Sequence, residues 1–305
     1  MKHCYAIYDF IIQSDLELPS LPSYTGSFEN NSLVKIQYAA IDAAGLKNPN
    51  QQGFTHQRIA KEFWFQIPPI AKFLISNGDS ISIDPRPGID DDSIRAFLLS
   101  TCLEILLRQR NHLVIAGYSL KLDRQGILFA GIPNNGQAML QGLLYKKGYT
   151  FLSSQFTAVN AQAELLPGVP QLEFWPAVAS ALDLGVPGLS TIRPEIKKYL
   201  VPLKQQYQIK PIKLTAIYTL KMHQQTEIKF AVLEGKKKKQ CLEPLMRNNQ
   251  VGVDLWYENN QPLPHLEILD NIPLVVLQVP TRGLKLHSVI QALENDIVER
   301  SATYA

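Results

Sequence analysis

The chain has few of the residues that build metal centres or disulfide frameworks. Its 305 residues include three cysteines, and Cys4, Cys102 and Cys241 share no metal-ligand spacing. The six histidines are scattered and include no His-Glu-x-x-His pair. We therefore expect no metal site, and we expect the cysteines to remain thiols in a reducing compartment.

Long apolar runs and a cleavable leader are also missing. No run approaches the roughly 20 apolar residues that a membrane-spanning helix needs. The N-terminal stretch MKHCYAIYDFII continues to Asp15 without a small-residue cleavage site, so it predicts a strand and not a signal peptide. We expect a cytoplasmic protein with no membrane span.

The residues that are present predict an α/β fold with α+β character. Hydrophobic residues make up 46% of the chain and charged residues 19%, which is typical of a soluble globular protein. Residues 1–95 alternate short apolar runs with turn residues, and Asn77-Gly78 is a hairpin signal between two of these runs. Residues 90–110 then change to helical spacing. We predict a β-rich N-terminal portion, residues 1–95, packed on a core of residues 96–305 as one integrated domain.

Positive charge is concentrated in one segment. Residues 191–240 hold twelve Lys or Arg against three Glu, a charge of +9 in a chain whose net charge is +3. The densest part, Lys236–Lys239, is expected to form a solvated turn between two strands. A basic surface can attract nucleic acid or an acidic partner. No aromatic interleaving or nucleic-acid module accompanies the charge, so the solvated turn is the favoured interpretation.

The stretch FAGIPNNGQAML has the glycine spacing of a phosphate-binding loop. Gly131 follows the apolar strand ILFA, four residues separate it from Gly136, and a helix is predicted to open at Ala138. Glycines let such a loop curl round an anion and aim backbone N–H groups at it, and the helix dipole adds positive potential. Asn134 and Asn135 stand where residues that tolerate a positive φ are wanted.

The groups that carry chemistry in a phosphate loop are absent. The motif continues with a lysine, which brings positive charge to the phosphates, and with a serine or threonine, whose hydroxyl binds magnesium. Here these positions hold Gln137, which has no charge, and Ala138, which cannot bind a metal. The residues that could still hold an anion or a nucleotide weakly are Gly131, Asn134, Asn135, Gly136 and Gln137.

The surroundings of the loop resemble the HPr kinase-like proteins, serine kinases of the HPr kinase and phosphoenolpyruvate carboxykinase type. In that family a strand leads through a turn into V-L-F-A-G, the phosphate loop, a helix and a strand reading G-Y-x-L-L-S-D-D. The counterparts here are LVIAGYSL, ILFAG, IPNNGQAM and GYTFLSSQ, and flanking segments such as YDFIIQSDLELPSLP and GVPQLEFWP match in the same order. The resemblance covers most of the chain. It implies an HPr kinase/PEP carboxykinase-like P-loop fold with a degenerate Walker A motif, and a homo-oligomer, which is common in the family.

The resemblance fails at the positions that carry the family's chemistry. The family's first-strand histidine falls at Ala116, and its loop lysine and magnesium-binding hydroxyl fall at Gln137 and Ala138. Its aspartate pair, which supplies the general base and a metal ligand, falls at Ser154 and Gln155. Loss of one electrostatic group typically costs on the order of 10²–10³ in rate, and phosphoryl transfer depends almost wholly on such groups. We therefore expect no catalytic residue, no cofactor and no ordinary kinase activity.

Three functions remain open. The first is a pseudokinase that binds a protein, a peptide or a small ligand as an accessory or regulatory module. The second is an atypical ATP-dependent serine kinase in which Lys121, Asp123, Lys146 or Lys147 takes over the chemistry, although a lone charge is usually solvated surface. The third is binding of nucleic acid or an acidic partner through residues 191–240. We favour the first.

Overall fold

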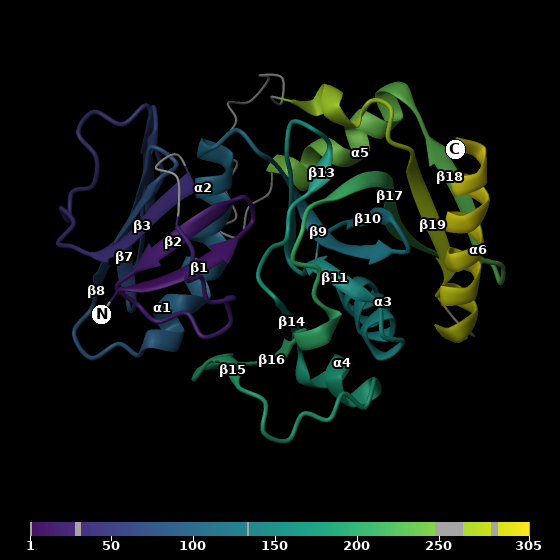
Figure 1. Ribbon diagram of the computed structural model, residues 1–305, viewed down its shortest axis with the longest axis horizontal. Helices are drawn as coiled ribbons and strands as arrows, with labels where there is room; N and C mark the ends of the chain where they lie inside the picture. The colour runs from purple at the N-terminus through teal and green to yellow at the C-terminus, as the bar shows by residue number, and fades with distance from the viewer. Residues whose placement is uncertain (1, 28–31, 133, 248–264, 282–285, 305) are drawn as a thin grey trace.

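The computed structural model describes residues 2–27, 32–132, 134–247, 265–281 and 286–304. The fold is mixed α/β, with three sheets and helices on their faces. In Figure 1 the N-terminal sheet and the helices packed on it lie on one side, and the rest of the chain lies on the other. No helix in the described ranges is long and apolar enough to cross a membrane.

The first sheet has eight strands in the order β1-β2-β3-β8-β7-β6-β5-β4. Its strands are β1 (His3–Ile7), β2 (Phe10–Ser14), β3 (Leu33–Tyr38), β4 (Gln51–Gln52), β5 (His56–Ile59), β6 (Glu62–Ile67), β7 (Ala71–Ser76) and β8 (Ser80–Pro85). The predicted hairpin is confirmed, because β7 and β8 are antiparallel and join through Asn77 and Gly78, at φ of 58° and 73°.

One helical segment covers a face of this sheet. It consists of α1 (Asp91–Phe97), the π-helical stretch η2 (Leu98–Cys102) and α2 (Leu103–Gln109), as the spacing predicts. Asp90 caps its first turn by accepting a hydrogen bond from the Ser93 N–H, and apolar residues such as Leu98 pack into the core of the first sheet. The predicted boundary after residue 95 therefore falls inside α1.

The second sheet also has eight strands, in the order β10-β9-β12-β13-β17-β19-β18, and β11 pairs with β9. Its strands are β9 (Leu113–Leu122), β10 (Gln125–Ala130), β11 (Thr150–Ser153), β12 (Phe156–Val159), β13 (Glu164–Leu165), β17 (Ile212–His223), β18 (Lys229–Leu233) and β19 (Leu274–Pro280). β17 pairs in parallel with both β10 and β19. The loop after β10 therefore lies at the carboxyl edge of three parallel strands, an edge at which α/β proteins often bind ligands.

Helices cover both faces of the second sheet. On one face α3 (Asn135–Lys146), α4 (Pro176–Ala181) and α6 (Leu286–Tyr304) share an apolar cluster with the strands, and on the other α5 (Gly235–Arg247) packs through Leu242 and Met246. The third sheet, in the order β14-β16-β15, has three strands. They are β14 (Gln171–Phe174), β15 (Thr191–Arg193) and β16 (Ile196–Pro202). Two short 3-10 helices are η3 (Lys204–Gln206) and η4 (Leu266–Leu269).

The predicted turn at the lysine run is wrong, because Lys236–Lys239 lie in the first part of α5. Lys238 is only 8% exposed, and its Nζ donates to the backbone carbonyls of Leu269, Asp270 and Ile272. Its spacing of four residues from the buried Leu242 places both side chains on one helix face. The lysine run is therefore part of an amphipathic helix, in which Lys238 points inward and donates hydrogen bonds to the backbone at the end of η4.

Candidate functional site

Backbone pairing brings together three segments that contain predicted site positions: β9 with Ala116, the loop after β10, and the connection before β12 with Ser154 and Gln155. β9 lies between β10 and β12 in the second sheet. The Gly131 N–H donates to the Ala116 carbonyl over 2.9 Å, and the Gly117 N–H donates to the Gln155 carbonyl over 3.0 Å. The loop and the positions of the family's histidine and aspartates are therefore direct neighbours.

Gly117 permits this close approach. Its φ is 141°, a conformation that favours glycine. A Cβ placed on it would lie 2.1 Å from the Phe129 carbonyl oxygen and 3.0 Å from the Ala130 Cα. The strand that carries Ala116 thus reaches the start of the loop at a point where no side chain fits.

Asn134 fixes the start of the helix after the loop. Its backbone is extended, with φ −140° and ψ 173°, and its side-chain oxygen accepts from the Gln137 N–H over 3.0 Å. It is an N-cap and does not adopt a positive φ. Because of this cap α3 begins at Asn135, three residues before the predicted start at Ala138.

Gln137 folds back over the loop. The residue is 6% exposed, and its Nε2 donates to the Ala130 carbonyl over 3.2 Å. A Cβ on Gly131 would lie 2.0 Å from the same nitrogen. The side chain at the position of the family's lysine is therefore bonded to the end of β10 and lies against the first glycine of the loop.

Several donors of the loop are already engaged. The N–H groups of Gly131 and Gln137 donate within the protein, as described, and the Ala138 N–H donates to the Asn134 carbonyl over 2.9 Å. Pro133 has no N–H. Among the residues predicted to hold an anion, Asn135 and Gly136 are first-turn residues whose N–H groups have no intrahelical acceptor. These two N–H groups are the best placed to meet an anion, and anion binding by the loop stays a prediction.

Two apolar side chains of β17 lie close to the second glycine, along with the Asn134 side-chain oxygen. A Cβ on Gly136 would lie 3.2 Å from Leu220 Cδ2 and 3.9 Å from Met222 Sδ, both from β17. Met222 is 46% exposed and Ile132, in the loop, is 52% exposed. Such surroundings offer no charge to a triphosphate.

Ser154 and Gln155 form the connection between β11 and β12. The Ser154 carbonyl accepts from Gln141 Nε2 of α3 over 3.0 Å. The Gln155 amide donates to the Glu173 carboxylate, which also accepts from Lys198 Nζ over 2.7 Å. The Glu173 side chain is only 5% exposed. A buried carboxylate thus lies one hydrogen bond from Gln155, one of the two positions at which the resemblance would place the family's aspartates.

Glu173 is the residue that sequence reasoning missed. Within the segment GVPQLEFWP, QLEF forms β14, with Leu172 and Phe174 buried. The period-2 alternation of this segment puts Gln171 and Glu173 on the opposite face from these two residues. That alternation was the available signal, and it could not show which part of the chain the carboxylate faces.

A cavity of about 370 Å³ opens beside Ser154 and Gln155. Residues of α1 and η2 line one part of the cavity, and residues of β14, β15 and β16 line another part. The two parts meet where β15 lies beside α1 (Figure 1). Residues that line the cavity include Tyr8, Asp92, Arg95, Leu99, Phe156, Glu173, Ser190 and Leu200. The volume is in the range of small-molecule sites, which is about 300–1,000 Å³.

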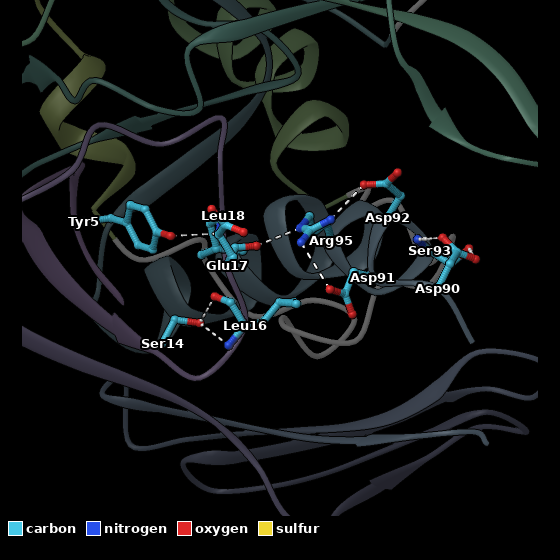
Figure 2. A network of polar contacts seen from close by, with 10 residues as sticks. All are labelled: Tyr5, Ser14, Leu16, Glu17, Leu18, Asp90, Asp91, Asp92, Ser93 and Arg95. Atoms are coloured by element: carbon cyan, nitrogen blue, oxygen red, sulfur yellow. Dashed lines mark hydrogen bonds and ion pairs between the residues drawn. The ribbon is translucent and has the colours of Figure 1, made fainter. Parts of the chain in front are cut away.

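Arg95 lines this cavity and makes hydrogen bonds to two segments of the chain. Its Nε donates to the Glu17 carbonyl over 2.7 Å, and its terminal nitrogens lie 2.9 Å and 3.3 Å from Asp92 and Asp91 (Figure 2). The segment that contains Glu17 is also bound by Tyr5, whose hydroxyl accepts from the Leu18 N–H over 2.8 Å (Figure 2). These contacts tie the chain after β2 to α1, which contributes Asp92 and Arg95 to the lining of the cavity.

A chain of buried hydroxyls lies behind the cavity. Ser153, which lines it, has its Oγ 2.7 Å from Ser119 Oγ and 2.7 Å from Thr157 Oγ1. All three residues are at most 1% exposed. The hydroxyls satisfy one another and fix β11 and β12 against β9.

The charged candidates for an atypical kinase lie away from the loop. Lys121 and Asp123 are at the turn between β9 and β10, the opposite end of β10 from the loop. Lys146 Nζ donates to the Leu182 carbonyl, and Lys147 lies 3.8 Å from Glu294. Both lysines are near the C-terminal end of α3, roughly 16 Å from its start at 1.5 Å per residue. In the described part of the chain, no three His, Cys, Asp or Glu side chains are grouped to hold a metal ion.

No family model and no curated protein matches this chain. Among solved structures, the chain is similar to the HPr(Ser) kinase/phosphatase from Coxiella burnetii, with 13% sequence identity and a TM-score of 0.26. The matched region covers 61% of this chain and 98% of that protein. A TM-score this low does not show a shared fold, and the class that the strands and helices themselves define is a mixed α/β protein.

Proposed function

We propose that the protein is an HPr kinase-like pseudokinase that lacks phosphotransferase activity and binds a protein, peptide or small ligand. The observation that carries this proposal is the burial and hydrogen bonding of the Gln137 side chain. This uncharged side chain takes the position of the family's lysine and is bonded to Ala130. With Ala138 beside it and Ser154 and Gln155 at the aspartate positions, the site holds none of the charges on which phosphoryl transfer depends.

The cavity beside Ser154 supports the binding part of the proposal. It is large enough for a small organic ligand or for side chains of a peptide, and it combines apolar walls with a few polar groups. A pseudokinase that has lost its nucleotide chemistry can still use the neighbouring cavity to recognise a partner.

Incubation with labelled ATP and magnesium tests the proposal, with a panel of proteins, peptides and free serine as acceptors. We expect no transfer of label to any acceptor, to the chain itself or to water. A double variant, Gln137→Lys with Ala138→Ser, supplies a comparison in which the loop motif is restored. Label transfer by the unaltered chain would overturn the proposal.

An atypical ATP-dependent serine kinase is the second candidate, because Glu173 lies next to Gln155. A carboxylate near the position of the missing aspartates could accept a proton in place of one of them. If label transfer occurs, Glu173→Gln should abolish it, and Glu195→Gln should leave it unchanged because Glu195 lies outside the cavity and is 65% exposed.

A further inference from the structure

The charges around the cavity are unbalanced toward the negative. On the α1 wall Arg95 is paired with both Asp91 and Asp92. On the β14 wall Glu173 is paired with Lys198. Of the charged residues that line the cavity itself, Asp92 and Glu173 are acidic and Arg95 is basic, which sums to −1. A cation entering the cavity is therefore favoured over an anion, and the effect grows as water is excluded.

Glu173 retains capacity to accept hydrogen bonds. A carboxylate has about four acceptor positions, and here Gln155 and Lys198 each occupy one. The hydroxyls of Ser154 and Ser190 line the same cavity and can also accept. An ammonium group, with three N–H donors, matches such a set of acceptors.

The remaining surface of the cavity is largely apolar. Leu99 of η2, Phe156 of β12 and Leu200 of β16 contribute side chains to it. Tyr8 also lines the cavity and carries no charge, because burial keeps the pKa of its phenol well above the ordinary value. A ligand that fills the space would carry an apolar part next to its charged group.

We propose that this cavity binds a primary ammonium group carried on an apolar stem, with the Glu173 carboxylate as its anchor. The inference rests on the proposed function, which makes the cavity a binding site, and it names the chemical class of the ligand. The shared chemistry is that of a free organic amine and of a lysine side chain in a peptide.

Carboxylate and phosphate ligands fit the cavity less well. They would approach Asp92 and Glu173, and the guanidinium of Arg95 already donates to two carboxylates and to the Glu17 carbonyl. Transfer of an anion to a site without a free cation costs hydration that nothing replaces.

Calorimetric titration of the full chain near neutral pH tests this assignment with three probes of matched size. The probes are 3-phenylpropylamine, its N-acetyl derivative and 3-phenylpropionate. We expect the amine to bind at least about tenfold more tightly than the other two, because a hydrogen bond to a charged group contributes about 1.5–3 kcal/mol. Equal affinities, a preference for the carboxylate, or no binding of the amine would overturn the inference.

A pair of peptides distinguishes the two sources of the amine. One has blocked termini and a single lysine between leucines, and the other carries acetyl-lysine at the same place. Binding of the lysine peptide more tightly than phenylpropylamine, with loss on acetylation, assigns the site to a peptide. The reverse order assigns it to a free amine. A peptide that binds equally well with acetyl-lysine would count against the assignment.

Two substitutions on the same wall should act in opposite directions. Glu173→Gln removes the anchoring charge and should abolish the preference for the amine, whereas Lys198→Met removes the competing cation and should tighten amine binding. If the Glu173–Lys198 pair only supported the fold, both substitutions should weaken amine binding. Glu195→Gln is the control, and near-ultraviolet circular dichroism checks that each variant keeps its fold.

The outcome is separable from that of the proposed function. Amine binding is measured without ATP, whereas the pseudokinase proposal is tested by label transfer. Failure of amine binding without label transfer overturns the inference alone, and label transfer together with amine binding overturns the pseudokinase proposal alone.

Discussion

The side-chain nitrogen of Gln137 lies 3.2 Å from the carbonyl oxygen of Ala130. The residue that follows Gly136 is therefore hydrogen-bonded to the last residue of β10, which precedes Gly131. This contact places a neutral amide against Gly131. Together with the Asn134 cap, it ties the first turn of α3 to the end of β10.

Restoring the motif should restore affinity for phosphates and not turnover. In the Gln137→Lys, Ala138→Ser variant, we expect affinity for inorganic triphosphate to rise by about 10–100-fold, because a charge-assisted hydrogen bond contributes about 1.5–3 kcal/mol. The matched control is Gln137→Met with Ala138→Ser, which replaces the same two residues without adding a charge. Calorimetry measures the affinity, and an equal gain in the control would show that charge is not what the loop lacks. Ser154 and Gln155 are unchanged, so label transfer from ATP should remain absent.

Gly117→Ala should destabilise the fold by more than about 2 kcal/mol, since the new Cβ would meet backbone atoms 2.1 Å and 3.0 Å away in addition to the strain of its φ. Gly88→Ala is the comparison, because Gly88 also has a positive φ of 80° but has nothing within 4 Å of its Cβ. Urea unfolding measures both. Equal losses at the two positions would contradict the close approach of β9 and β10.

Lys238→Met should lower the free energy of unfolding by about 2 kcal/mol or more, because it removes a buried charged donor from three backbone carbonyls at and just after the end of η4. Lys237→Met serves as the control, since Lys237 is exposed on the same helix. Urea unfolding of the two variants should separate them clearly. A Lys238 variant as stable as the Lys237 variant would argue against the buried lysine.

Stability should fall in mild acid partly through His56. The ring is buried, its Nδ1 has no hydrogen-bond partner among the described residues, and burial lowers its pKa below the ordinary value of 6.5. In the unfolded chain, the His56 ring therefore takes up a proton as the pH falls through the ordinary pKa of histidine. In the folded chain, the ring stays neutral until the pH reaches its lowered pKa. The free energy of unfolding must decrease over that window.

Urea midpoints at about pH 7 and about pH 5 measure the contribution of His56. His56→Phe should reduce the loss of stability between them, and His287→Gln, at an exposed histidine, should not. An unchanged loss in the His56 variant would mean that the ring is protonated in the folded state.

Local patterns were sufficient to predict much of the fold. The Asn77-Gly78 hairpin, the helix that begins at Asp91 and the strand, loop and helix around Gly131 follow from turn chemistry, capping and periodicity, which act over short stretches. The lysine run was misjudged because its charge outweighed the helical spacing of Lys238 and Leu242.

The site was predictable only as positions along the chain. Sequence order indicated that the loop and the segment around Ser154 belong together, and β9 does bring them side by side. The return of Gln137 to Ala130, and the arrival of Glu173 from β14 beside Gln155, depend on contacts between distant segments. No local pattern encodes such contacts, so the cavity could not be inferred from the sequence.

Calorimetric titration with ATP in the presence and absence of magnesium tests most directly whether the loop has lost its chemistry. We expect magnesium to make no difference, because Ala138 offers no metal ligand and the described residues hold no grouped carboxylates at the loop. Any residual binding should come from backbone N–H groups and be weak. Tight, saturable ATP binding that requires magnesium would contradict the proposal that the protein is a pseudokinase.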